Sequence, residues 1–420
     1  MVKNDKGWLY LPVEVKVRDL DSKLLLSYYA AKEGYNVFIG DHIMVELASV
    51  EYPEGIFFSK GGPHGFRKRI ITNAKNHGHT VVELDEEGLI INDKKKYLRD
   101  RMRRDMLQFV TQEYCWGSYQ KEIIVGANPD YEEKCHIVGN PRLDLLKPKF
   151  SSIYKEDAEQ ISNKYGEFIL INTRFSQYNS AKGKKDNIHF KHIKELYYNF
   201  LEMIKATCEK FPYTNIIIRP HPGENFESYR KALSGFNNIH VIHEGNIIKW
   251  LMSAKVIIHN GCTSGIEAFL LGKPLISYVP FNSNEVNIPN QLGMKATNIE
   301  EVYAFLKGII NKNIDYNPKY LDRNEKSLFY YCDWLNEKFS YESILHLSNK
   351  IHLPSPSTRK LPVNKNAFII KDKKKRKRRF SLTEIEIQNF YRKLDEIEGG
   401  SSRITISELT KNLFKINCGK

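Results

Sequence analysis

Short β-rich runs alternate with longer helical stretches along most of this chain, and this alternation is the feature that most restricts its fold. Runs such as NIIIR, VIIH and PLISY are rich in Ile and are bounded by Gly, Pro or Asn. Strands that alternate with helices form mainly parallel sheets with helices packed on both faces. The sequence therefore predicts an α/β protein.

Two successive series of strands are expected, and they meet near residue 150. Gly34 and Gly78 follow the first two helices of the first series, where glycine commonly ends a helix. The expected strands of that series cover residues 9–17, 35–39, 55–59 and 80–84, with helices from near Asp21, from near Pro63 and over 97–109. Those of the second series cover residues 168–172, 215–219, 239–243, 256–259 and 274–278.

The composition changes after about residue 353. The segment LPSPSTRKLPV is typical of a linker, and the run KDKKKRKRR from Lys371 to Arg379 then carries eight basic residues and one acid. Ser381 and Glu384 match a capping box and predict a short amphipathic helix. We therefore expect two α/β domains, 1–150 and 151–352, and a tail over 353–420 that holds the linker, the basic run and the helix.

Charge and cysteine usage restrict the partners and the compartment. The chain has 64 Lys and Arg against 50 Asp and Glu, a net charge of +14, which favours polyanionic partners such as nucleic acid, anionic lipid or phosphorylated substrates. Its six cysteines form no C-x-x-C pair, which argues against a disulfide framework and a structural zinc site. No long uncharged apolar run is present, so we expect neither a signal peptide nor a spanning helix, and a cytoplasmic location.

The segment NIIIRPHPGENF carries the sharpest local signal. Its strand delivers Arg219, His221 and Pro222 to the carboxyl end of a parallel strand, where ligands bind in open α/β sheets. A guanidinium and an imidazole at that edge would suit a phosphate whose negative charge grows as a nucleotide leaves. The structural alternative is that Pro220 and Pro222 end the strand and His221 is an ordinary loop residue.

The segment VIIHNGCTSGIEAFLLGKPLISY predicts a strand, a turn of small residues and a helix that opens at Thr263 or Ser264. The free N–H groups at a helix N-terminus attract anions, and the two hydroxyls add donors. Glu267, one turn further, could accept hydrogen bonds from ribose. The alternative is that Thr263 or Ser264 is a simple N-cap and Glu267 a favourable first-turn acid.

The first half contains an acidic cluster, DEEG, at the end of the strand over 80–84. Asp85, Glu86 or Glu87 could act as general base toward a sugar hydroxyl, although acids at strand ends are often solvated turns. Nearby, Gly61 and Gly62 permit close approach of a ligand and His64 could be catalytic, although a glycine turn before Pro63 needs no function.

Several common motifs are missing or unconvincing. The glycine turn matches neither G-x-G-x-x-G nor the P-loop, and no G-x-S-x-G elbow occurs. Asp19 and Asp21 form a D-x-D, but Asp21 fits better as a helix N-cap. With no compact set of ligands around it, we predict no tightly bound metal.

Taken together, these segments resemble glycosyltransferases of the GT-B architecture, in which two Rossmann-like domains face each other across a cleft and the second holds the nucleotide-sugar donor. More closely, the chain is similar to bacterial surface-carbohydrate biosynthesis proteins related to transferases of CMP-activated ulosonic acids (sialic, pseudaminic or Kdo-type). The resemblance covers about residues 8–345 and rests on PVEVKVRDLDSKLLL, LDEEG, YCWGSYQKEII, VGNPRLDLL, RPHPGE and NGCTSGIEAFLLGKPLISY.

The resemblance implies roles for particular residues. A [DE]-[DE]-G motif that supplies the base falls on Glu86, with Asp85 and Glu87 competing for the assignment, and an H-P motif that grips the CMP phosphate falls on His221 and Pro222. Thr263 and Ser264 would complete the phosphate site. The remaining residues of the expected site are Arg219, Gly265 and Glu267 for the nucleotide and Gly61, Gly62, His64 and Arg174 for a substrate loop.

The function implied is metal-independent transfer of a sugar, an ulosonic acid from CMP, to a surface polysaccharide or lipid-linked glycan, with no cofactor besides the nucleotide-sugar substrate. The basic run from Lys371 to Arg379 could hold the protein at the inner, anionic face of the membrane. The alternatives are a CDP-glycerol-type polyol-phosphate transferase and a UDP-sugar transferase or epimerase. A nucleic-acid-binding protein is a different class, and no specific nucleic acid is expected because the basic run lacks interleaved aromatic residues.

Overall fold

The computed structural model describes residues 5–281, 288–312, 328–335, 337–353 and 380–419. It divides into two compact units, unit 1 (Met1–Ile153 and Leu328–Lys420) and unit 2 (Tyr154–Ser327). The chain leaves unit 1 close to the expected boundary at 150, but it returns at Leu328, before the boundary expected at 352. The C-terminal tail is therefore part of unit 1, and the basic run from Lys371 to Arg379 lies outside the described residues.

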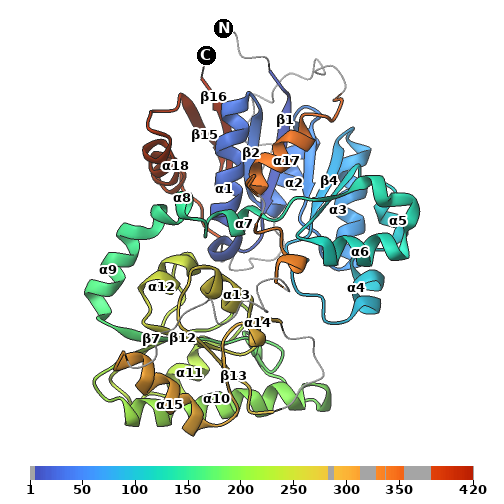
Figure 1. Ribbon diagram of the computed structural model, residues 1–420. Helices are drawn as coiled ribbons and strands as arrows, with labels where there is room; N and C mark the ends of the chain where they lie inside the picture. The colour runs from blue at the N-terminus through green and yellow to red at the C-terminus, as the bar shows by residue number, and fades with distance from the viewer. Residues whose placement is uncertain (1–4, 282–287, 313–327, 336, 354–379, 420) are drawn as a thin grey trace. The chain divides into compact units, whose positions relative to one another are not determined.

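Unit 1 is built on an eight-stranded sheet in the order β15-β16-β2-β1-β3-β4-β5-β6 (Figure 1). The six strands from the first part of the chain are parallel, and a C-terminal hairpin extends the sheet antiparallel along β2. The strands are β1 (Trp8–Val13), β2 (Asn36–Asp41), β3 (Ile56–Ser59), β4 (Thr80–Leu84), β5 (Gln112–Cys115), β6 (Cys135–Ile137), β15 (Ile404–Thr410) and β16 (Leu413–Cys418).

Helices follow the strands of unit 1 closely. They are α1 (Lys16–Glu33), α2 (His42–Glu51), α3 (His64–Asn76), α4 (Lys94–Asp100), α5 (Arg104–Leu107), α6 (Ser118–Ala127), α7 (Pro141–Asp144), α8 (Pro148–Ser151), α17 (Ser340–Ser348) and α18 (Glu384–Glu398). Gly34 ends α1 in the left-handed region with φ 107°, as expected of a glycine C-cap. A 3-10 turn, Pro129–Lys134, leads into β6.

Three predictions about these elements were wrong. The first strand ends at Val13, and α1 begins at Lys16 because Val15 O accepts from Asp19 N at 2.8 Å, so Asp21 lies inside the helix instead of capping it. The helix expected over 97–109 is interrupted between α4 and α5, where Arg101 leaves the helical backbone and binds Asp85. The capping box of α18 is formed by Thr383 and Glu386, not by the pair two residues earlier.

Unit 2 is built on a six-stranded parallel sheet in the order β11-β10-β7-β12-β13-β14. Its strands are β7 (Phe168–Asn172), β10 (Asn215–Arg219), β11 (Ile239–Val241), β12 (Val256–His259), β13 (Leu275–Tyr278) and β14 (Met294–Ala296), with a two-stranded hairpin of β8 (Asn179–Ser180) and β9 (Gly183–Lys184). The helices are α9 (Lys155–Tyr165), α10 (Lys191–Lys210), α11 (Phe226–Ala232), α12 (Ile247–Ser253), α13 (Thr263–Leu270), α14 (Ile288–Gln291) and α15 (Ile299–Ile310).

Alternation along the strands of unit 2 separates an apolar face from a partly polar one. Ile171, Ile218 and Ile258 belong to the core that packs on α10 and α15. Successive strand residues point to opposite faces, so Asn172, Arg219 and His259, which end β7, β10 and β12, point to the other face. Polar side chains therefore gather under the end of the sheet where its loops begin.

Both sheets reverse their strand order at a defined point. In unit 2 the chain runs from β7 to β10 and β11 on one side and then returns to β12 on the other side. In unit 1 the reversal lies between β1 and β3. Ligands of open α/β sheets bind outside the carboxyl ends of the strands at such reversals. The predicted α/β class is confirmed, and these two edges are where its sites should be sought. No described helix is long and apolar enough to cross a membrane.

Candidate functional site

Neighbouring strands of unit 2 bring several of the predicted site residues to one sheet edge. The loop after β10 carries His221 and Pro222, the loop after β7 carries Arg174, and the turn after β12 leads into Thr263 and Ser264. Because β10, β7 and β12 are adjacent and parallel, these loops all leave the same edge. The two segments singled out in the sequence, RPHP and NGCTSG, thus leave the same edge of the sheet, with the loop after β7 between them.

Hydrogen bonds set the orientation of His221. Gly223 N donates to His221 Nδ1 at 3.1 Å, and His221 N donates to Glu224 Oε1 at 3.0 Å. A neutral imidazole that accepts at Nδ1 carries its proton on Nε2. His221 is exposed, so a ligand from outside the loop can reach its imidazole ring.

Glu224 holds this loop in place from below. Its carboxylate is buried and accepts from Thr173 Oγ1 at 2.8 Å and from Tyr229 Oη at 2.5 Å. Burial raises the pKa of Glu224, while these donors lower it. The sequence analysis did not identify Glu224 as a positioning residue. The available signal was an acid directly after the Pro-Gly turn of a strand-end loop.

The N-terminus of α13 forms the second part of the edge. Its N-cap is Cys262, and no side chain caps the helix. Ser264 Oγ lies 3.0 Å from Cys262 Sγ, and Thr263 is half-buried. Gly265 is required by packing, because a Cβ there would lie 2.4 Å from the ring of His259. Gly265 N donates to Cys262 O at 2.9 Å, so what this turn offers an anion is the positive end of the α13 dipole together with the N–H of Thr263.

Arg174, which the sequence analysis grouped with the glycine loop of unit 1, lies at this edge of unit 2. Its Nε donates to Asn260 O at 2.7 Å, and its Nη2 donates to Asn260 Oδ1 at 3.3 Å. A Cβ on Gly261 would lie 2.8 Å from Arg174 Nη2. The guanidinium thus lies against the turn that opens α13 and adds positive charge there.

Arg219 occupies a different position from the one that its residue type suggested. Its guanidinium is buried, donates to Glu244 O at 2.8 Å and to Gly245 O at 3.1 Å, and lies over the ring of Trp250. Burial lowers the pKa of Arg219 to about 10, against the opposing charges of Glu244 and of Glu267, which is also buried. The fork therefore holds the loop after β11, and the direct phosphate contact expected of Arg219 is not what the structure presents.

His259 lies directly beneath α13 at the end of β12. It is fully buried, and its Nε2 lies 3.2 Å from Ser277 Oγ. Burial, together with the positive charge of Arg174, lowers the pKa of His259 to about 3. The imidazole is therefore neutral at physiological pH.

In unit 1 the three acids of the DEEG segment have different surroundings. Asp85 is buried and accepts from Tyr97 Oη at 3.1 Å and from Arg101 Nε at 2.9 Å. Both oxygens of Glu86 are buried, and Lys23 Nζ lies 2.7 Å from Glu86 Oε1. Glu87 is exposed and pairs with Arg18. Asp85 thus has a structural role, and Glu87 is the acid that solvent reaches.

The glycine turn after β3 packs on the same loop. Gly61 has φ 74°, and a Cβ there would lie 2.4 Å from Asp85 Oδ1, so this glycine permits contact between two loops of unit 1. Gly62 has φ 134°. His64 is half-buried, with Nε2 3.7 Å from Asp105 Oδ2. The predicted substrate loop is therefore close to the acidic segment. Among the described residues, no group of three or more His, Cys, Asp and Glu is placed to hold a metal ion.

Comparison with known proteins gives structural likeness without sequence likeness. No protein-family model matches the chain, and no curated protein sequence does. Among solved structures, the UDP-GlcNAc 2-epimerase of Methanocaldococcus jannaschii is 14% identical, with a TM-score of 0.52 over 81% of this chain and 98% of that one. The UDP-GlcNAc 2-epimerase of Neisseria meningitidis is 12% identical, with a TM-score of 0.53 over 81% and 98%.

A third similar structure is the wall teichoic acid polymerase TagF, which is 12% identical, with a TM-score of 0.53 over 82% of this chain and 88% of that one. Likeness at such identities establishes the fold. The GT-B architecture predicted from the sequence is confirmed in this sense. The more specific relationship to transferases of CMP-activated ulosonic acids gains no support from these comparisons.

Proposed function

We propose that this chain is an enzyme of the GT-B type that binds a nucleotide-activated sugar or polyol in unit 2 and transfers the activated group. The observation that carries the proposal is the gathering of anion-binding groups at the strand reversal of unit 2. These groups are Nε2–H of His221, the guanidinium of Arg174 and the uncapped N-terminus of α13. Together they suit the phosphate of a leaving nucleotide.

The chemistry requires that negative charge on the leaving phosphate be balanced as the bond to the transferred group breaks. His221 donates from Nε2 while its Nδ1 is held by Gly223 N, so no reorientation is needed. Arg174 and the α13 N-terminus add fixed positive charge, and this takes the place of the contact that Arg219 was expected to make. Removal of one such donor typically costs about 10²–10³ in rate.

The acceptor hydroxyl needs a general base, and we assign that role to Glu87 ahead of Glu86. A base must come within hydrogen-bonding distance of the proton that it removes. The oxygens of Glu86 are buried against Lys23, so an acceptor hydroxyl has less access to them than to the exposed carboxylate of Glu87. We expect Glu87→Gln to abolish transfer. A Glu87→Gln enzyme with normal activity, together with an inactive Glu86→Gln enzyme, would return the role to Glu86.

The identity of the donor is the finer part of the proposal. The motif resemblance favours an ulosonic acid carried by CMP, whereas the similar structures are UDP-GlcNAc 2-epimerases and a wall teichoic acid polymerase. Our order of preference is a CMP-linked ulosonic acid, then a CDP-linked polyol, then a UDP-linked sugar for transfer or epimerisation. In the first two cases the acceptor would be a surface polysaccharide or a lipid-linked glycan.

The first experiment is thermal stabilisation by CMP, CDP, UMP, UDP and GDP, with a short single-stranded oligonucleotide alongside. A ligand at 100 times its Kd adds about 2.7 kcal/mol to the stability of the folded state. We expect one nucleotide to stabilise the wild type and His189→Ala, an exposed histidine elsewhere in unit 2, but not His221→Ala. Stabilisation by every nucleotide in His221→Ala, or by the oligonucleotide alone, would refute the proposed site.

Membrane association through the basic run is tested separately. Each Lys or Arg near an anionic bilayer contributes about 1 kcal/mol of attraction. Removing the whole tail would also remove β16 from its pairing with β2, so truncation is a poor test. We instead compare the full chain with a variant in which the basic residues from Lys371 to Arg379 are replaced by Gln. Equal sedimentation of both with anionic liposomes would reject docking by this run.

A further inference from the structure

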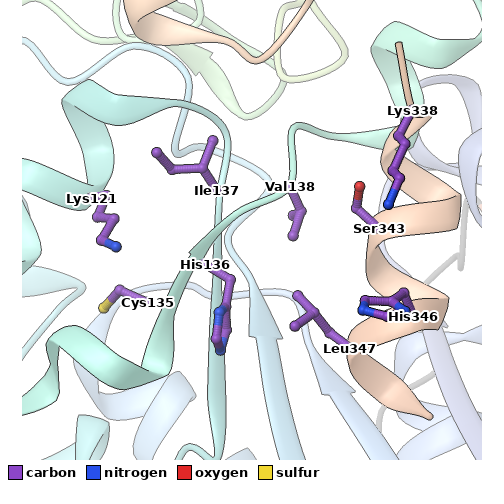
Figure 2. Close-up of a pocket in the computed structure, with 9 residues that line it drawn as sticks. All are labelled: Lys121, Cys135, His136, Ile137, Val138, Lys338, Ser343, His346 and Leu347. Carbon is purple, nitrogen blue, oxygen red and sulfur yellow. The ribbon is translucent and has the colours of Figure 1, made fainter. Parts of the chain in front are cut away.

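A cavity of about 300 Å³ lies in unit 1 beside β6, the strand at the edge of the sheet (Figure 2). Its walls come from α6, from β6 and from α17 together with the residues just before it. The helix α17 is fixed at its start, because the buried carboxylate of Asp144 accepts from Ser340 N at 2.9 Å and from Tyr341 N at 3.0 Å. The cavity therefore lies between parts of the chain that are about 200 residues apart in sequence, and the hydrogen bond from Ser340 N to Asp144, 196 residues away, holds them together.

Two lysines and two histidines are among the residues that line this cavity. Lys121 comes from α6, His136 from β6, and Lys338 and His346 from α17 or the residues before it, and Figure 2 shows them around the same opening. Ser343 adds a hydroxyl. No aspartate or glutamate is among the residues that line the cavity. The lining is therefore basic, with hydrogen-bond donors on both of its sides.

Four of these donors are not used by the described part of the protein. Within the described part of the chain, the side chains of Lys121, His136, Ser343 and His346 take part in no hydrogen bond or ion pair. The pKa of His136 is lowered, first by burial and then by the positive charges of Lys121 and Lys350. Cations placed close together repel one another, and a bound anion would relieve that repulsion.

We propose that this cavity binds the phosphate group of a small phosphorylated molecule. The ammonium of Lys121, the imidazoles of His136 and His346 and the hydroxyl of Ser343 would donate to the phosphate oxygens. Ile137, Val138 and Leu347 form an apolar part of the wall that can cover the organic portion of the ligand. The site shares no residue with the donor site proposed for unit 2, so it stands or falls independently of that proposal.

Calorimetry with inorganic phosphate tests the site. The titration uses the full chain carrying His221→Ala, which removes the ligand that we placed in unit 2. We expect the His221→Ala chain to bind phosphate. Adding Lys121→Gln or His346→Gln to it should lower the affinity by about tenfold or more, because each change removes a donor to a charged group. Lys95→Gln, an equal loss of charge at an exposed position of α4, should bind as its parent does. Equal weakening in Lys95→Gln would show a diffuse charge effect and overturn the proposal.

A local reporter excludes binding elsewhere. Ile137 lines the cavity and is 38% exposed, so Ile137→Cys provides a thiol that alkylating reagents can reach. Phosphate should slow alkylation of this thiol by iodoacetamide, as followed by peptide mass spectrometry, and should fail to do so when Lys121→Gln is added. Phosphate binding without protection of this thiol would refute the assignment. Competition by phosphatidic acid vesicles would identify the phosphate as a lipid headgroup, and competition by sugar phosphates alone would identify a soluble ligand.

Discussion

The pH dependence of unit 2 should be governed in part by His259. This residue is fully buried beneath α13, with a pKa of about 3 against an ordinary value of 6.5. A histidine whose pKa is lowered by folding binds its proton mainly in the unfolded state. The stability that it contributes is therefore present above pH 6.5 and is lost as the pH falls toward 3.

The size of this effect follows from the two pKa values. In the unfolded state His259 becomes protonated below its ordinary pKa of 6.5, and pH 5.0 lies about 1.5 pH units below that value. Each pH unit over which only the unfolded state is protonated costs about 1.4 kcal/mol of stability. We therefore expect unit 2 to lose about 2 kcal/mol of stability over this range because of His259. His259→Gln, which cannot titrate, should lack this component.

Hydrogen–deuterium exchange of the β12 amides measures the effect locally. After correction for the intrinsic exchange rate, the acceleration of exchange from pH 7.5 to pH 5.0 should be about 30-fold larger in the wild type than in His259→Gln, which corresponds to about 2 kcal/mol. All other titrating groups are common to both proteins, so they cancel when the wild type is compared with His259→Gln. The same pH dependence in both proteins would refute the argument that His259 is held neutral by burial.

Three further predictions concern other buried contacts. Glu224→Ala removes the acceptor of His221 N, so affinity for the stabilising nucleotide should fall about tenfold by calorimetry; unchanged affinity would contradict the positioning role. Gly61→Ala forces a Cβ against Asp85 at φ 74° and should lower the free energy of unfolding of unit 1, measured by urea denaturation, by about 2 kcal/mol or more. A loss within about 0.5 kcal/mol, the usual effect of a surface substitution, would contradict this. Burial raises the pKa of Asp144 to about 6, so its contribution to stability is present at low pH and is lost as the pH rises. We expect the free energy of unfolding to fall by about 1 kcal/mol from pH 5 to pH 7.5 for this reason. Urea denaturation of Asp144→Asn should not show this pH dependence.

Much of the fold was predictable because its signals are local. The strands expected over 80–84, 168–172, 215–219 and 256–259 occur at these positions, since runs of β-branched residues bounded by turn residues need no distant partner to be recognised. The meeting of RPHP and NGCTSG at one edge was predictable as well, because parallel strands all end on the same side of a sheet. This edge carries His221, Thr263 and Ser264 as expected.

The side-chain partners within the site were not predictable. Arg219 was expected to present its fork to a phosphate, but the carbonyls of Glu244 and Gly245 accept its protons. Glu86 was the first of three competing candidates for the base, and nothing in the sequence indicated that Lys23, distant in sequence, would bury it in an ion pair. Residue type and strand position indicate what a side chain can bind. They do not indicate which of several nearby partners it meets, because that depends on the packing of helices against the sheet.

The α/β class, the position of most strands and the sheet edge where a site was sought could all be predicted from the sequence, because each depends on periodicity and on turn residues within a few positions of one another. The composition of unit 1 became clear only from the folded chain. The hairpin of β15 and β16 completes a sheet that begins at Trp8, and Asp144 holds the start of α17. These contacts join segments about 200 to 400 residues apart, and no local pattern records such a pairing, because its free energy comes from surfaces that exist only once both segments have folded.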